Sequence, residues 1–308
     1  MTISKEIFSL LNAIRDDRSH GAIELARRAM VVLKRAAECS QAGDVEEFLQ
    51  EQRKVVGALV QARPSMAPIR NVARLMIRAI TERAGEMDVN SIRSLTVSIA
   101  DEMLAESLRV IEKIAENTLE LTGDGIIIMT HSYSSTVMAA LRKVALRREN
   151  IMILVTRSGS GETGMETARQ LGGYGAPVML IDDAAAAVHI PRAGMLVLGA
   201  DTVCPEGVIN ATGSYQLAVI SAAAGVPVYV LCDTLKFDAE LTRENVDLEY
   251  IESPQVAGVS GLPPGVTACE YRFDFTPMEM VTGIITEERI LLSSDVPAYI
   301  KGLGGSLT

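Results

Sequence analysis

The chain has 308 residues, a formal net charge of −10 and 48% apolar residues, enough to bury the core of one large or two modest domains. Its sequence pI near 5.0 means that the overall field repels nucleic acid and anionic membranes, so an anion must be captured by a local site. No apolar run reaches the roughly 20 residues of a membrane span, and the start MTISKEIF lacks a signal peptide's apolar core, which predicts a cytoplasmic protein.

The first part of the chain, residues 4–119, is predicted to be helical. Apolar residues recur three and four positions apart in IELARRAMVVLKRAAECS and NVARLMIRAITERAGEM. Breaks fall at Gly43-Asp44, at Arg63-Pro64-Ser65 and at 88–91, where polar side chains can cap the following helix. We therefore place an N-terminal helical domain at residues 1–118.

After residue 125 the pattern changes to short, unbroken, β-branched runs: GIIIMT, NIMILVT, PVMLID, GMLVLG and PVYVLC. Such runs, with helical patterns between most of them, are typical of parallel strands buried on both faces. The sequence therefore predicts an α/β fold in which a Rossmann-like parallel sheet domain occupies residues 119–308. Ligands of such sheets bind at the carboxyl ends of the strands. The loops expected there are 130–135, 156–161, 182–183, 199–213 and 233–236.

The stretch VTRSGSGETGMETARQL, residues 155–171, predicts a strand, a Ser/Gly turn at 157–161 and a helix that begins near Glu162. Glycines let backbone amides converge, and a helix N-terminus favours negative charge, so this turn can hold a phosphate without a cationic side chain. The stretch is neither a Walker loop nor GxGxxG, and a flexible strand-to-helix turn remains the alternative.

The run MTHSYSSTVMAAL, residues 129–141, places several hydroxyls between a strand and a helix, and some of them should cap that helix. His131 precedes Ser132, which raises the possibility of a Ser-His catalytic pair. Adjacent residues of a strand point to opposite faces, however, and neither GxSxG nor an oxyanion signature surrounds them.

Two acidic positions follow other strands. Asp201 can act as a general base or bind sugar hydroxyls, and capping a turn is the alternative role. Asp182-Asp183 is an acidic pair, which we expect to cap the next turn and not to bind a metal. The four cysteines lack CxxC spacing, so we expect neither a zinc site nor a disulfide framework, and mainly buried thiols.

Read in order, six pieces resemble one family. They are HGAIELARRA, ARPSMAPIRN, MTHSYSSTV, GADTVCPEGVINATGSYQLAV, CDTLKFD and FDFTPMEMVTGIITEERI. The family contains the regulatory alpha, beta and delta subunits of translation initiation factor 2B and two isomerases, of methylthioribose-1-phosphate and ribose-1,5-bisphosphate. The resemblance covers nearly the whole chain. It implies a helical N-terminal domain, a Rossmann-like C-terminal domain, homo-dimers or higher homo-oligomers, and a phosphosugar or nucleotide pocket between the domains.

The resemblance also assigns candidate catalytic residues. The family's isomerases use a cysteine and an aspartate to move a proton or hydride between C1 and C2 of an opened aldose phosphate. The aspartate matches Asp201, but the cysteine position falls on Ser132. Because a hydroxyl has a far higher pKa than a thiol, this departure weakens the isomerase interpretation.

The family's phosphate-binding positions match only in part. Family arginines fall on His20 and Gly159, and a family lysine falls on Ala211, so cationic phosphate ligands are missing. We therefore predict that the SGSG turn contacts a phosphate through its backbone amides in place of the family arginine; the alternative is that the pocket has shifted to another ligand. The ligand-binding residues that the resemblance and the motifs together predict are Gly21, Ala22, Arg63, His131, Arg157, Ser158, Gly159, Ser160, Asn210 and Lys236.

The sequence therefore predicts a regulatory protein like the factor 2B alpha subunit. It would bind a nucleoside monophosphate or pentose phosphate and act through protein partners, a translation factor among them. The alternative is a divergent aldose-ketose isomerase in which Asp201 works with Ser132 or His131. Whether the chain is an enzyme stays open at this point. We expect no cofactor, and self-association of the Rossmann-like half through the small residues of VISAAAGV.

Overall fold

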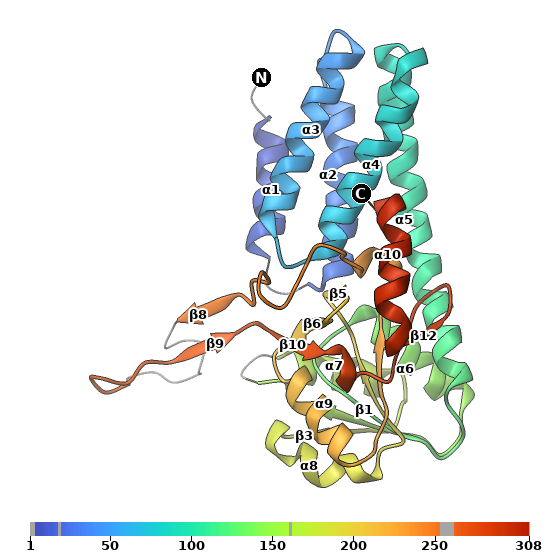
Figure 1. Cartoon of the computed structure of the whole chain (residues 1–308), viewed down its shortest axis with the longest axis vertical. Coiled ribbons are helices and arrows are strands. Elements are labelled where there is room, and N and C mark those ends of the chain that lie inside the picture. Colours follow the sequence, from blue (N-terminus) through green and yellow to red (C-terminus); the bar gives the residue numbers. More distant parts are fainter. Residues whose placement is uncertain (1–3, 18–19, 160–161, 253–261, 308) are drawn as a thin grey trace. The chain divides into compact units, whose positions relative to one another are not determined.

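The computed structural model describes residues 4–17, 20–159, 162–252 and 262–307 (Figure 1). The chain divides into two compact units. The first comprises Met1–Val110, Leu235–Phe237 and Gly302–Thr308, and the second comprises Ile111–Thr234 and Asp238–Lys301. The division of the sequence into domains at residue 118 stays a proposal, because residue 118 lies inside one continuous helix, Val89–Glu120.

The first unit is helical, as the periodicity predicts. Its helices are α1 (Lys5–Asp16), α2 (Ala22–Cys39), α3 (Val45–Ala62), α4 (Ala67–Arg83) and the first part of α5 (Val89–Glu120), with a 3₁₀ turn η1 (Ala84–Glu86) before α5. The predicted breaks and caps are confirmed: Asp44 accepts from Glu47 N at 2.8 Å and Asp88 from Ser91 N at 2.8 Å. Phe48, Leu25 and Leu59 are fully buried in the core of this unit.

The second unit contains a seven-stranded sheet in the order β12-β11-β7-β4-β1-β2-β3. The strands are β1 (Ile127–Thr130), β2 (Met152–Thr156), β3 (Val178–Ile181), β4 (Met195–Leu198), β7 (Val228–Leu231), β11 (Gly283–Ile285) and β12 (Ile290–Leu292). All neighbours pair in parallel except β12, which pairs antiparallel with β11 at the edge. Each of the five apolar runs that the sequence analysis singled out forms one of the parallel strands.

Helices and short turns lie between these strands and after the last of them. The helices are α6 (Ser135–Arg147), α7 (Thr163–Gly173), α8 (Ala186–His189), α9 (Ser214–Ala223) and α10 (Val296–Leu307). The short 3₁₀ turns are η2 (Asp183–Ala185), η3 (Ile190–Arg192), η4 (Thr234–Lys236), η5 (Met278–Met280) and η6 (Ser293–Asp295). Ser134 caps α6 by accepting from Val137 N at 3.4 Å, so one of the predicted capping hydroxyls is identified. No helix in the described ranges is long and apolar enough to cross a membrane.

Residues 199–213, predicted to form one strand-end loop, instead contain two strands. A separate antiparallel sheet has the order β10-β6-β5, formed by β10 (Phe273–Pro277), β6 (Gly207–Ala211) and β5 (Thr202–Cys204). A small hairpin pairs β8 (Tyr250–Glu252) with β9 (Cys269–Tyr271). The three-stranded sheet was missed because β5 and β6 are short and β10 reaches them from a distant part of the sequence.

The expectation of buried thiols holds for half of the cysteines. None of the four forms a disulfide in the described structure; Cys204 and Cys232 are buried, whereas Cys39 is half-buried and Cys269, on β9, is exposed.

Candidate functional site

His131 stands at the centre of a polar network at the carboxyl ends of β1 and β2. It is 3% exposed, and its Nδ1 lies 2.6 Å from Thr156 Oγ1 while its Nε2 lies 2.8 Å from the carbonyl oxygen of Thr212. Because a carbonyl only accepts, Nε2 carries the hydrogen and Nδ1 accepts from Thr156. Burial lowers the pKa of His131, in spite of the Thr212 carbonyl and the nearby Asp183 charge. The imidazole is therefore a neutral link between two loops.

Ser132 and Ser158 both adopt left-handed backbone conformations, with φ of 60° and 66°. Ser132 N donates to Ser158 Oγ at 2.7 Å, and Thr167 Oγ1 donates to the carbonyl of Ser132 at 2.8 Å. Left-handed conformations of non-glycine residues cost of order 1–3 kcal/mol and gather at functional sites. Ser132 Oγ itself lies 3.3 Å from Thr163 Oγ1. The hydroxyl thus turns to Thr163 and not to His131, which agrees with the sequence argument against a Ser-His pair.

The predicted phosphate turn is occupied by a side chain of the protein. Asp183 accepts from Ser158 N at 2.8 Å and from Gly159 N at 2.6 Å. These are two of the amides predicted to contact a phosphate, while Ser160 lies outside the described residues. Asp183 therefore caps the preceding turn at 158–159 and not the next one, for which no side-chain cap is formed at η2. A phosphate would have to displace Asp183 to reach these amides. The exposed Arg157 side chain lies 3.7 Å from Asp182.

A second turn, residues 212–215, closes the network from the other side. Gly213 has φ of 108°, and a Cβ at this position would lie 2.7 Å from the imidazole of His131, so only glycine fits there. Asp274 Oδ2 accepts from Gly213 N at 2.7 Å and from Tyr215 N at 3.0 Å. The buried Asn210 donates from Nδ2 to Ser214 Oγ at 2.9 Å, and Ser214 Oγ donates to the Ala211 carbonyl at 2.7 Å. The turn thereby fixes Asn210.

Asp274 is the functional candidate that sequence reasoning missed. Burial raises its pKa to about 6, outweighing the backbone amides that stabilise the charge. Its second oxygen, Oδ1, is buried and has no hydrogen-bond partner among the described residues. The available signal was a lone acid inside the apolar strand FDFTP.

Asp201 follows β4 in the same unit, and its backbone N donates to the carbonyl of Ile209 at 2.8 Å. A Cβ added at Gly199 would lie 2.8 Å from the Ser134 side chain and 3.8 Å from Asn210 Oδ1. The chain segments that follow β1 and β4 therefore come close to β6. The structure thus brings the segments after β1 and β4, which carry His131, Ser132 and Asp201, close to Asn210 on β6. The described residues contain no group of three metal-ligating side chains, so nothing in these ranges marks a metal site.

The predicted cations at positions 63 and 236 belong to the first unit, and both are buried. Arg63 is 4% exposed, and its Nη1 donates to the carbonyl of Asp17 at 2.6 Å. Lys236, 3% exposed, lies on a segment whose carbonyls at Leu235 and Phe237 accept from Asn71 at 2.7 and 2.8 Å. Their grouping with the strand-end loops of the second unit stays a prediction.

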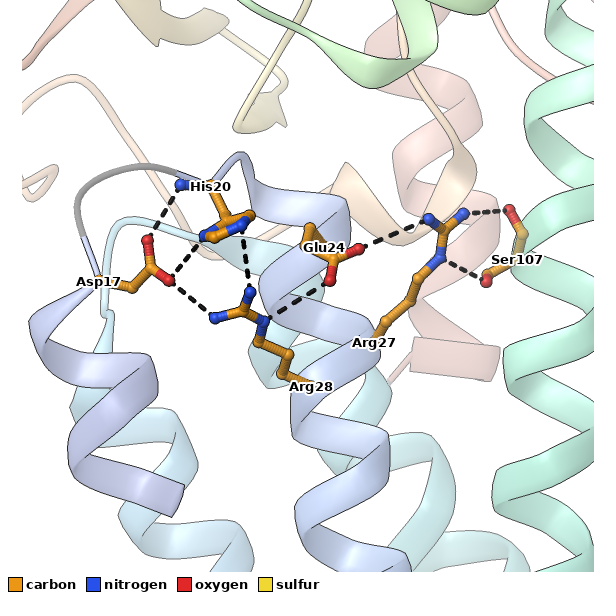
Figure 2. Close-up of polar contacts among 6 residues, drawn as sticks. All are labelled: Asp17, His20, Glu24, Arg27, Arg28 and Ser107. Atoms are coloured by element: carbon orange, nitrogen blue, oxygen red, sulfur yellow. Dashed lines mark hydrogen bonds and ion pairs between the residues drawn. The ribbon is translucent and has the colours of Figure 1, made fainter. Parts of the chain in front are cut away.

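Figure 2 shows a charged cluster at the start of α2 that is not predicted from the sequence pattern. The carboxylate of Asp17 accepts from His20 Nδ1 and from Arg28 Nη1, each at 2.8 Å, and from His20 N at 3.0 Å. Arg28 Nη2 donates to His20 Nε2 at 3.1 Å, so these contacts fit a neutral imidazole with its hydrogen on Nδ1. Gly21, the N-cap of α2, makes no side-chain cap, and Ala22 is buried as the first helical residue.

Two further ion pairs extend this cluster along α2. Glu24 lies 3.7 Å from Arg27 and 3.5 Å from Arg28 (Figure 2). Arg27 donates from Nε to Ser107 Oγ at 2.8 Å and from Nη2 to the Ser107 carbonyl at 3.1 Å. His20, which stands where the family has an arginine, is therefore hydrogen-bonded to Asp17 and Arg28.

The fold and this edge of the sheet define a class: proteins with a helical first unit and a largely parallel sheet whose strand-end loops are joined by a polar network. Residues 18–291 match the profile of the Initiation factor 2 subunit family. The chain belongs to this family, which confirms both the resemblance and the predicted fold class.

The similar proteins carry two kinds of name, isomerase and translation initiation factor. Proteins named ribose 1,5-bisphosphate isomerase are 29% identical in Thermococcus kodakarensis, over 94% of this chain and 92% of that protein, and 30% identical in Haloferax volcanii, over 94% and 89%. A solved structure of the Pyrococcus horikoshii translation initiation factor eIF-2B has a TM-score of 0.80 at 27% identity and covers 94% of this chain and 98% of its own.

Proposed function

We propose that this chain is a factor 2B-like regulatory protein that binds a pentose phosphate or nucleoside monophosphate and acts through a protein partner without isomerising its ligand. The observation that carries the proposal is the environment of Ser132. Its hydroxyl contacts Thr163, and within the described ranges neither a carboxylate nor an imidazole bonds it. His131, the nearest base in sequence, uses both ring nitrogens on Thr156 and Thr212.

Aldose-ketose isomerisation requires a group that gains and loses a proton near the working pH. A serine hydroxyl without a bonded base does not meet that requirement. The groups suited to binding are retained: Asn210 and Asp201 for sugar hydroxyls, and the cations Arg63 and Lys236 for phosphate. The proposal is therefore that the chain still binds a sugar phosphate, although the acid-base pair needed for isomerisation is incomplete.

The test combines turnover and binding on the full chain. Calorimetry should show that ribose-1,5-bisphosphate or methylthioribose-1-phosphate binds. Incubation with either compound, followed by ¹³C NMR, should show no ketose. Ser132→Cys should create ketose formation, because acid-base catalysis is typically worth about 10² to 10⁴-fold. The matched control is Ser294→Cys, at an exposed serine of η6. Rapid turnover by the wild type would contradict the proposal.

Arg63 allows a separate test of the binding site. A charge-assisted hydrogen bond contributes about 1.5 to 3 kcal/mol, so Arg63→Gln should weaken binding of AMP or ribose-1,5-bisphosphate roughly tenfold to a hundredfold. Arg53→Gln is the matched control, since Arg53 is an exposed residue 3.9 Å from Glu46. If neither compound binds below millimolar concentration, the phosphate proposal is wrong.

The second candidate function is a ribose-phosphate isomerase. It is favoured by the relatives named ribose 1,5-bisphosphate isomerase, each of which aligns with 94% of this chain. In that case Asp201 would be the base, and Ser132 or His131 would assist. Asp201→Asn would then abolish ketose formation, whereas under the first proposal the wild type forms none to abolish.

We also propose that the chain self-associates through α9. This helix, SYQLAVISAA, carries no charged residue, and Tyr215 and Val219 are exposed on it, 37% and 41%. An uncharged exposed helix face that is small and apolar apart from Gln216 is suited to packing against a second copy.

A further inference from the structure

The 212–215 turn is held in part by one carboxylate and in turn holds two candidate site residues. Asp274, on β10, accepts from Gly213 N and Tyr215 N at the start of α9. The Thr212 carbonyl accepts from His131, and Ser214 accepts from Asn210. Asp274 and Asn210 are also directly opposite each other in the β10–β6 pairing, which places their side chains on the same face of that sheet.

No charged side chain on the packed elements compensates Asp274. Neither β6 (GVINA) nor α9 (SYQLAVISAA) contains an acidic or basic residue. Arg272, its chain neighbour, pairs with Glu249 at 3.1 Å, and the neutral His131 packs against Gly213. The backbone amides at the helix start therefore stabilise the carboxylate, as expected for an acid at a helix N-terminus. Thr212 is held separately, because its N donates to the Arg272 carbonyl at 3.0 Å and its Oγ1 to the Tyr271 carbonyl. Asp274 is the side chain that holds the Gly213 and Tyr215 amides of the turn.

We propose that Asp274 is a positioning residue: by holding the 212–215 turn it fixes the side-chain amide of Asn210 and the ring of His131. Its consequence for the ligand rests on the proposed function, because it matters for binding only if Asn210 contacts the ligand. Asp274 itself does not touch the reacting atoms in this proposal. Replacement by asparagine keeps one oxygen that can accept from the two amides, and replacement by alanine removes it.

The charge of Asp274 predicts a pH dependence that a purely packing role would not produce. Burial raises its pKa to about 6, so the carboxylate takes up a proton in mild acid. Hydrogen bonds to a charged acceptor are roughly twice as strong as those to a neutral one. The grip on the turn should therefore weaken as the pH falls through about 6 in the wild type but not in Asp274→Asn.

The first experiment needs no ligand. The chain has three histidines, so NMR of the uniformly ¹⁵N-labelled full protein, with His20→Gln and His189→Gln for assignment, reports the ring nitrogens of His131. Asn210→Ser identifies the side-chain amide signals of Asn210 with the same labelling. The wild type at pH 8 should show the neutral Nε2–H form. Asp274→Ala should mix the two tautomers and shift the Asn210 side-chain amide signals, and Asp274→Asn should restore both. Unchanged His131 and Asn210 signals in Asp274→Ala would overturn the proposal. If Asp274→Ala does not fold, a His131 and Asn210 spectrum that is identical in the wild type and Asp274→Asn from pH 8 to pH 5 overturns it equally.

The second experiment measures binding of ribose-1,5-bisphosphate by calorimetry at pH 8 and pH 5.5. The ratio of the wild-type Kd to the Asp274→Asn Kd cancels the ionisation of the ligand, and it should rise on acidification by up to about tenfold, or 1.4 kcal/mol. Asp247→Asn is the matched control, because Asp247 is exposed and also accepts a backbone amide, from Glu249 at 2.9 Å. A pH-independent ratio contradicts the positioning role. Absence of binding by every variant contradicts the proposed function instead, and the NMR result then decides the role of Asp274.

Discussion

The raised pKa of Asp274 predicts how the unfolding free energy changes with pH. As the pH falls, the unfolding free energy of the wild type should increase relative to that of a variant without this carboxyl group. The pKa of Asp274 rises from an ordinary 3.8 to about 6 because burial penalises the charge. The folded state therefore binds the proton more tightly than the unfolded chain does. The resulting stabilisation is complete below pH 3.8 and is lost as the pH rises through about 6. Asp274→Asn removes this titration and keeps one acceptor oxygen.

The size of the effect follows from linkage. Each pKa unit is worth about 1.36 kcal/mol, so the full change corresponds to about 3 kcal/mol. Between pH 8 and pH 4.5, the wild type should gain at most about 2 kcal/mol of unfolding free energy relative to Asp274→Asn. The free-energy difference between the two proteins at pH 8 need not be known in advance. Its change between pH 8 and pH 4.5 reports only the protonation of Asp274.

Urea unfolding of both proteins at pH 8 and pH 4.5, followed by circular dichroism, measures this double difference. Asp247→Asn serves as the control for a change of one charge at an exposed position, and it should show no such gain. A wild-type minus Asp274→Asn difference that stays constant with pH, or one that falls on acidification, would refute the assignment of a buried, uncompensated carboxylate to this position.

Three further predictions concern packing, the α2 cluster and assembly. Gly213→Ala should destabilise the protein by several kcal/mol, of order 2–4, because the residue has φ of 108° and its Cβ would meet His131 at 2.7 Å. Gly172→Ala, in open space on α7, should not lower the midpoint of thermal unfolding. Asp17→Asn should cost about 1–3 kcal/mol in urea unfolding, since it removes a charged acceptor from Arg28, and no change would show that the cluster is only a surface contact. Val219→Arg should shift the sedimentation coefficient to that of a monomer, whereas Val31→Arg, also at an exposed valine, should leave it unchanged.

The main architecture was predictable because its signals are local. The strands β1, β2, β3, β4 and β7 each appear in the sequence as a continuous apolar run, and the helices of the first unit show a 3.6-residue period. The parallel strand β11 has only three residues, Gly283–Ile285, and was not predicted. Asp44 and Asp88 were recognisable as caps because the amide that a cap accepts from lies within three residues. Family membership could be predicted for a different reason, namely that several motifs occur in one order over nearly the whole chain.

The polar network was not predictable from local pattern, because its partners are distant in sequence. Asp274 accepts from an amide 61 residues away, and His131 contacts a carbonyl 81 residues away. The amides at Ser158 and Gly159 were correctly placed on a turn, but the anion that they bind here is Asp183, which lies beyond the next helix. A sequence motif can indicate that amides converge, whereas only the fold shows which group already occupies them.

Contacts of the main chain fix the backbone at position 132. Replacing its side chain should therefore change the chemical group presented there and not its placement. The backbone N of Ser132 donates to Ser158 and its carbonyl accepts from Thr167, so the left-handed conformation is maintained by main-chain contacts. The side chain adds one contact, to Thr163 at 3.3 Å, and a neutral hydrogen bond of this kind contributes about 0.5–1.5 kcal/mol. Because a cysteine keeps every main-chain contact, Ser132→Cys changes the pKa of the group presented at the sheet edge with little change in its placement. A gain of turnover in that variant would therefore be attributable to the thiol, and its absence would place the missing function elsewhere in the site.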